Sequence, residues 1–241
     1  PLTPYGAPQV PAQASLNTNE NPYSPSPALQ KAIADAVMVA AANLNRYPDR
    51  DATVLRTKLA DYINELSGTK FSADNIWAAN GSNEIIQSIF LAFAQVSVLG
   101  FTPSYSMHPL IAKVTGGQWI DGKRNADFSL NTSDAITEIQ KTKPTLTFIT
   151  TPNNPTGGAV TIAEIQKLAD ACKSVGGLLV VDEAYAEFSQ EKSAVTLIAN
   201  NPHVIVIRTM SKAFAFAGAR VGYLVSDVAV KDAMMIVRLP Y

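Results

Sequence analysis

The sequence predicts an α/β protein whose mostly parallel sheet is sandwiched by helices. Three short apolar runs have the length and composition of buried strands, at residues 146–151, 177–182 and 204–207. Residues 162–174, between the first two runs, carry apolar side chains at helical spacing. A helix between two such strands is typical of a right-handed crossover in a parallel sheet. Sheets of this kind bind ligands at the carboxyl ends of their strands.

Composition narrows the class of protein. The chain has 241 residues, of which 47% are hydrophobic and 16% charged, as in a well-cored globular enzyme. Its net charge of −1 provides no basic surface for nucleic acid. The single cysteine, Cys172, excludes an intramolecular disulfide and fits a reducing compartment. No apolar stretch approaches the roughly 18 residues of a membrane helix. We therefore expect a cytoplasmic protein that binds neither nucleic acid nor a membrane.

The first part of the chain predicts an arm followed by two helices. Residues 1–27 contain seven prolines and little periodicity, which favours an extended arm. Residues 27–42 are rich in alanine and predict a helix, and residues 52–66 predict an amphipathic helix. The polar loop between them carries Tyr47.

The next segment predicts a helix start that could bind an anion. Ser82 and Asn83 follow a glycine and precede a predicted helix at residues 85–93. Free backbone N–H groups at the positive end of a helix dipole bind phosphate. The alternative is a plain N-cap with nothing bound.

A strand is expected next, at residues 96–100. The passage from helix to strand at residues 93–98 lacks a turn residue, which predicts missing residues there.

Polar side chains follow the last predicted strand, at residues 204–207. Thr209, Ser211 and Arg220 are suitable donors for a phosphate, and Lys212 is an amine that can form a Schiff base with an aldehyde. The alternative is a solvated loop with an ordinary surface lysine. Similar groups follow the other two strands. Asn154 lies in the turn PNNPTGG, Asp182 ends the run at residues 177–182, and Glu183 and Tyr185 come just after it.

The motifs PNNPTG, DEAY and SKAFAFAGAR resemble those of the fold type I aminotransferases that depend on pyridoxal 5′-phosphate (PLP). Within that superfamily, LNTNENP, NRYPD, NGSNE, PSYSMH and DEAYAEF are most similar to the histidinol-phosphate aminotransferases. The resemblance extends over the whole chain.

This resemblance implies a role for each candidate residue. Lys212, Asp182 and Tyr185 would be catalytic: Lys212 would bind the cofactor aldehyde and shuttle a proton, and Asp182 would pair with the pyridine nitrogen. Asn154 and Tyr185 would contact the 3′ oxygen of the ring, and Tyr105 would stack on its face. The residues expected at the cofactor phosphate are Ser82, Asn83, Thr209, Ser211, Arg220 and, from a neighbouring subunit, Tyr47.

The resemblance also implies a substrate, a dimer and a domain division. The amino group would pass from L-histidinol phosphate to 2-oxoglutarate in histidine biosynthesis, with Tyr5, Asn19 and Tyr47 at the substrate. The resemblance also implies a homodimer with shared active sites. Residues 1–35 would form the arm and the start of a small domain, residues 36–241 the large PLP-binding domain, and the rest of the small domain would lie beyond the chain.

Several alternatives remain open from the sequence. The same scaffold supports aromatic amino acid aminotransferases and threonine-phosphate decarboxylases, and a core without its small domain could be inert. The only histidines, His108 and His203, form no recognisable triad or zinc pattern, so we expect structural roles for both and no metal site.

Overall fold

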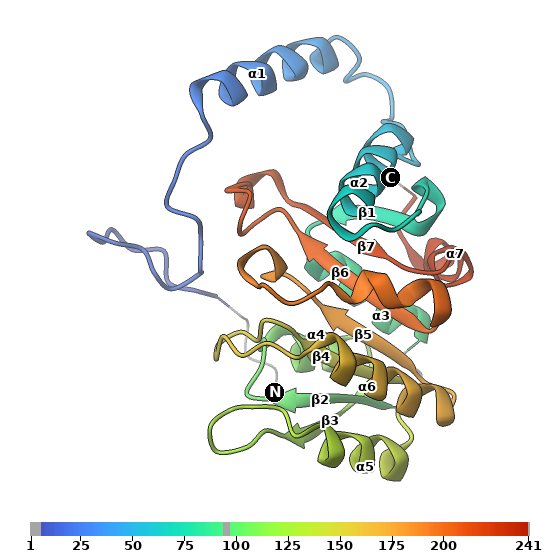
Figure 1. Ribbon diagram of the computed structural model, residues 1–241. Helices are drawn as coiled ribbons and strands as arrows, with labels where there is room; N and C mark the ends of the chain where they lie inside the picture. The colour runs from blue at the N-terminus through green and yellow to red at the C-terminus, as the bar shows by residue number, and fades with distance from the viewer. Residues whose placement is uncertain (1–5, 94–96, 241) are drawn as a thin grey trace.

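The computed structural model describes residues 6–93 and 97–240 (Figure 1). Tyr5 and most of the helix-to-strand passage, residues 94–96, lie outside the described residues. The substrate contact expected of Tyr5 and the missing residues expected at that passage therefore stay predictions.

A seven-stranded sheet in the order β1-β7-β6-β5-β4-β2-β3 forms the centre of the molecule. Pairs β2·β3, β2·β4, β4·β5 and β5·β6 are parallel, while β7 runs antiparallel to both of its neighbours, β1 and β6. The predicted mostly parallel sheet is thus confirmed. The strands are β1 (Ile76–Asn80), β2 (Ser97–Thr102), β3 (Gln118–Lys123), β4 (Leu146–Thr150), β5 (Leu178–Asp182), β6 (Val204–Thr209) and β7 (Val221–Val225).

Helices cover both faces of the sheet, which places apolar side chains on both sides of each central strand. In Figure 1, α5 and α6 lie in front of the sheet and α3 and α4 behind it. Leu179 and Val181 of β5 belong to the core cluster under α2, α5 and α6, while Val180 belongs to the cluster under α3, α4 and α7. The α-helices are α1 (Pro27–Ala41), α2 (Thr53–Ser67), α3 (Ser82–Phe93), α4 (Met107–Val114), α5 (Thr132–Thr142), α6 (Ile162–Ser174) and α7 (Val228–Val237).

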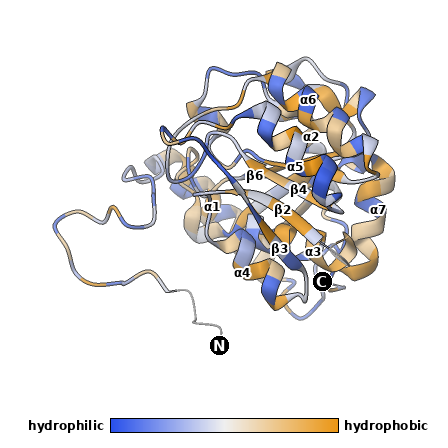
Figure 2. Ribbon diagram, turned by 90° about the horizontal axis from the view of Figure 1, so that it is seen from below, coloured by the Kyte–Doolittle hydropathy of each residue, from blue (hydrophilic) through white to orange (hydrophobic). Residues whose placement is uncertain are grey.

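This two-sided burial explains why the central strands were predictable as continuous apolar runs. Figure 2 shows hydrophobic colour on the strands at the centre of the molecule. The three predicted strands and the helix at residues 162–174 are confirmed, with ends that differ by at most two residues. The helix expected from residue 85 begins earlier, at Ser82, and only Gly81 separates it from β1.

Four elements had no clear sequence signal: α4, β3, α5 and β7. The strand β3 lies at the edge of the sheet and contains Asp121 and Gly122, which are poor strand formers. In β7, Gly222 is needed because a Cβ there would meet the backbone of Gly81 and Ser82. The crossover from β5 to β6 contains two 3-10 turns, η2 (Ala186–Phe188) and η3 (Ala194–Asn200).

Helix α1 stands apart from the sheet in Figure 1. Ser26 caps α1 by accepting a hydrogen bond from the backbone N–H of Leu29, at 3.3 Å. Among the described residues, α1 has no buried side chain. The domain boundary expected after residue 35 falls within this helix, and the division stays a prediction. No helix in the described ranges is long and apolar enough to cross a membrane.

Candidate active site

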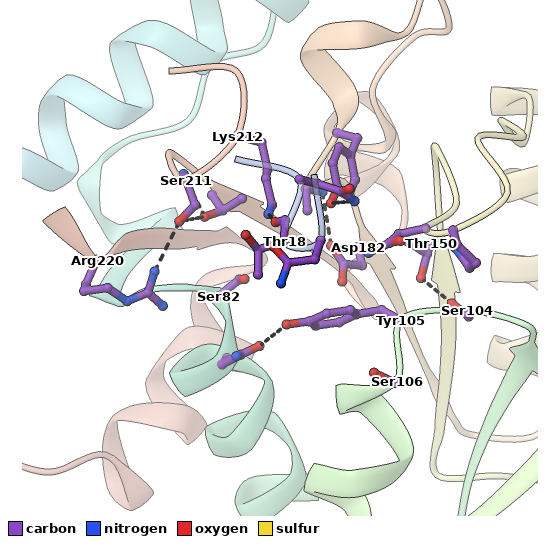
Figure 3. Close-up of a pocket in the computed structure, with 18 residues that line it drawn as sticks. Thr18, Ser82, Ser104, Tyr105, Ser106, Thr150, Asp182, Ser211, Lys212 and Arg220 are labelled. Carbon is purple, nitrogen blue, oxygen red and sulfur yellow. Dashed lines mark hydrogen bonds between the residues drawn. The ribbon is translucent and has the colours of Figure 1, made fainter. Parts of the chain in front are cut away.

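A cavity of about 620 Å³ opens at the carboxyl edge of the sheet, beyond the ends of β4, β5 and β6 and beside the start of α3. Figure 3 shows Ser82, Ser211 and Arg220 toward one end of it and Asp182, Thr150 and Ser104 toward the other. Eleven of the candidate residues line it: Asn19, Ser82, Asn83, Tyr105, Asn154, Asp182, Tyr185, Thr209, Ser211, Lys212 and Arg220.

One end of the cavity gathers hydroxyl, backbone and guanidinium donors. The Thr209 hydroxyl donates to Ser211 Oγ at 3.0 Å, and Arg220 Nη1 donates to the same Oγ at 3.3 Å. Ser82, at the first turn of α3, lines the same end. The first N–H groups of a helix have no partner within the helix, and they add to the positive potential. This end is suited to a phosphate group.

Gly81 makes the close approach at this end possible. Its φ of 87° lies in the left-handed region, and a Cβ there would lie 2.9 Å from Arg220 Cζ and closer still to Nη2. A side chain at Gly81 would therefore push the guanidinium away from the start of α3. Glycine is therefore favoured in NGSNE for two separate reasons, the left-handed backbone of the turn and the space needed by Arg220.

Lys212 lies half-buried between the arm and the sheet. Its Nζ donates to the backbone carbonyl of Thr18 at 2.7 Å and lies 5.8 Å from the centre of the Tyr185 ring. Burial lowers the pKa of Lys212, Glu20 opposes this effect, and Arg220 adds to it. Burial and Arg220 thus favour the neutral amine, whereas the carboxylate of Glu20 favours the ammonium form.

A Glu20→Gln variant is expected to lower the pKa of Lys212 further, because it removes the carboxylate that favours the ammonium form. The rate at which Lys212 reacts with an amine-directed reagent, followed by peptide mapping across pH, should reach half its maximum at lower pH than in the unmodified protein. Glu65→Gln, an exposed change on α2, is the matched control. An unchanged or higher midpoint would refute the electrostatic role of Glu20.

Asp182 is buried at the opposite end of the cavity, where two groups hold its carboxylate. Oδ1 accepts from the backbone N–H of Ala184 at 3.1 Å, and Oδ2 lies 2.9 Å from His108 Nε2. His108 is 1% exposed and meets the Tyr105 ring edge-on, at 5.4 Å between ring centroids. His108 therefore contacts the carboxyl group that lines the cavity, in addition to packing in the core as expected. The only sequence signal was its position three residues after Tyr105.

Three further contacts order the walls of the cavity. Tyr105 donates its hydroxyl hydrogen to Asn83 Oδ1 at 3.2 Å, which links the ring to the first turn of α3. The hydroxyls of Ser104 and Thr150 lie 2.9 Å apart. Asn19 Nδ2 donates to the Tyr185 hydroxyl at 3.0 Å, so the arm reaches the cavity as expected.

The cavity is also lined by residues that were not predicted from the sequence: Asn17, Thr18, Ser104, Ser106, Thr150, Pro155 and Ala184.

Some candidates lie elsewhere. Tyr47 is 79% exposed and is not among the residues that line this cavity, so its expected contact across a subunit boundary stays a prediction. His203 Nε2 lies 2.8 Å from the carbonyl oxygen of Ala169, in a structural position.

Burial raises the pKa of the Cys172 thiol to about 11, so this buried side chain stays protonated at neutral pH.

Comparisons with known proteins give one consistent family. Residues 11–241 match the model of the family described as aminotransferase class I and II. A histidinol-phosphate aminotransferase of Thermobifida fusca is 53% identical over 242 aligned positions, which cover 99% of this chain and 64% of the relative. The chain thus spans about 64% of the length of the curated relatives it matches.

Two solved structures show the same fold. The histidinol-phosphate aminotransferase of Sinorhizobium meliloti, in complex with pyridoxal-5′-phosphate, matches with a TM-score of 0.78 and 25% identity, over 92% of this chain and 59% of that one. The enzyme of the same name from Clostridium acetobutylicum matches with a TM-score of 0.77 and 25% identity, over 93% and 64% of the two chains.

Proposed function

Because the chain belongs to the aminotransferase class I and II family, we propose that its cavity holds PLP and that it acts as a PLP-dependent transaminase. The observation that carries the proposal is the meeting, in one cavity, of an amine, a buried carboxylate and a cluster of phosphate donors. The PLP complex of the Sinorhizobium meliloti relative supports the same cofactor.

The residues present fit the chemistry of this cofactor. Its phosphate fits the end formed by Ser82, Ser211 and Arg220, where Gly81 leaves room for the guanidinium. Its ring nitrogen fits Asp182, a buried carboxyl group that would supply a negative charge beside it. Between these ends lie the Tyr105 ring and the Lys212 amine, which fit the flat ring and the aldehyde. The other proposed cofactor contacts are Asn83, Asn154, Tyr185 and Thr209.

When bound, PLP supplies an electron sink for the charge left on a substrate carbon after its proton departs. The chain itself must move that proton, and Lys212 Nζ is the proposed carrier. Its lowered pKa raises the fraction of neutral amine available near neutral pH. Asp182, held by His108 and Ala184, would supply negative charge at the end where the ring nitrogen would lie.

We propose L-histidinol phosphate as amino donor and 2-oxoglutarate as acceptor, giving imidazole acetol phosphate and glutamate in histidine biosynthesis. The names of the relatives support this choice over an aromatic aminotransferase, a threonine-phosphate decarboxylase or an inert core. Asn19 lies in the cavity where an arm residue could meet the donor. The roles of Tyr5 and Tyr47, the homodimer, the domain division and the cytoplasmic location are further parts of this proposal.

A panel of amino donors tests the proposed substrate in the intact protein. A site built for a phosphate leaves buried polar groups unpaired when the phosphate is absent. Histidinol phosphate is therefore expected to exceed phenylalanine and tyrosine by at least ~100-fold in kcat/KM, measured by glutamate formation from 2-oxoglutarate. Equal values would assign the chain to an aromatic aminotransferase, and no glutamate with any donor would refute transamination.

A further inference from the structure

Arg208 carries a buried ion-pair network that lies just outside the cavity. It is on β6, four residues before Lys212, and is 4% exposed. Its Nη2 lies 2.8 Å from Glu183 Oε2 and its Nη1 lies 2.9 Å from Glu187 Oε1. One guanidinium thus bridges two carboxylates through two nitrogens held in one plane, whereas a lysine ammonium would have to reach both from a single nitrogen. Arg208 is not among the residues that line the cavity.

The two carboxylates flank Tyr185 in the sequence, two residues before it and two after. They mark the two ends of a short segment, residues 183–187. Glu183 comes directly after β5, and Glu187 lies in η2. Between them, the Tyr185 hydroxyl accepts from Asn19 in the cavity, and the Tyr185 ring lies 5.8 Å from Lys212 Nζ. The segment that carries Tyr185 is therefore tied to β6 at both ends through one side chain.

The two ties differ in how much else supports them. Glu183 also accepts from the Ser193 hydroxyl and the Ala194 N–H, each at 2.7 Å. Glu187 Oε2 is buried and makes no hydrogen bond within the described residues, so Oε1 provides the tie to Arg208. Loss of the Glu187 contact should free the downstream end of the segment while Glu183 keeps the upstream end in place.

We propose that Arg208 and Glu187 are positioning residues that fix the Tyr185 hydroxyl at its place in the cavity. This inference rests on the proposed function, since it concerns the contact of Tyr185 with the bound cofactor. Buried ion pairs add little net stability compared with apolar packing, but they can specify one arrangement of the chain. Here the arrangement specified is that of a side chain within the cavity.

Absorbance of the PLP-loaded intact protein tests the proposal, because the visible absorbance of cofactor attached at Lys212 would change with pH. The quantity compared between variants is the pH at the midpoint of this absorbance change. Tyr185→Phe removes one hydrogen bond to the ring oxygen and should move the midpoint by roughly 0.7 pH units, the equivalent of one neutral hydrogen bond. Glu187→Gln should move the midpoint in the same direction. The double variant should move it no further than Tyr185→Phe alone, since both changes remove the same contact.

Glu191→Gln, an exposed change a few residues along the chain, is the matched control and should leave the midpoint unchanged. A Glu187→Gln protein with a lower Tm and an unmoved midpoint would overturn the proposal, as would additive shifts in the double variant or no shift in Tyr185→Phe. If Glu187→Gln does not fold, Arg208→Lys keeps the buried charge but replaces two nitrogens held in one plane by a single nitrogen, and the same outcomes apply. An unmodified protein without cofactor absorbance would instead refute the proposed function.

Discussion

Replacing Asp182 with asparagine is expected to lower transamination at least ~100-fold, because a charge partner aimed at the reacting ring is worth several kcal/mol. Asparagine has nearly the same shape, and its Oδ1 can still accept from the Ala184 N–H as Asp182 does. The fold and cofactor binding should therefore survive, and only the negative charge beside the ring nitrogen should be lost. Steady-state kcat, cofactor absorbance and Tm measured on one preparation separate these effects.

The matched control is Asp170→Asn, on the exposed side of α6. Its kcat should equal that of the unmodified protein. An Asp182→Asn variant with near-normal turnover would show that Asp182 serves only to hold His108 and Ala184 in place.

Replacing Lys212 with alanine is expected to reduce transamination by at least ~10³-fold, since it removes both the nucleophile and the proton carrier. The structure leaves few substitutes, because Lys212 is the only lysine among the residues that line the described cavity. Lys192→Ala, an exposed change, is the control and should retain full activity. A Lys212→Ala protein with more than about a tenth of normal kcat would contradict the assignment of both roles.

Much of the sheet could be predicted because its central strands are buried on both faces. Leu179, Val180 and Val181 had to be apolar to meet two helix layers, and this requirement is visible as a continuous run. The polar residues that follow such runs are therefore predicted to lie at one edge of the sheet. Lys212, Asp182 and Ser211 do meet there.

Contacts that depend on distant backbone could not be predicted. The carbonyl of Thr18 accepts from Lys212 across 194 residues, and a backbone carbonyl has no residue-specific signal. The His108–Asp182 pair spans 74 residues, and a single histidine more often packs in a core than orients a carboxylate. In β7, Gly222 weakened the strand pattern because its position demands the smallest residue beside Gly81 and Ser82.

Covalent attachment of PLP at Lys212 is the central claim, and borohydride reduction of the PLP-loaded intact protein followed by peptide mapping tests it most directly. Reduction fixes the cofactor to the amine that holds it, and the mass of each lysine peptide then identifies that amine. We predict a pyridoxyl group on Lys212, and none when Lys212→Ala is treated in the same way. A label on Lys113 or Lys192, or on no lysine at all, would contradict the account.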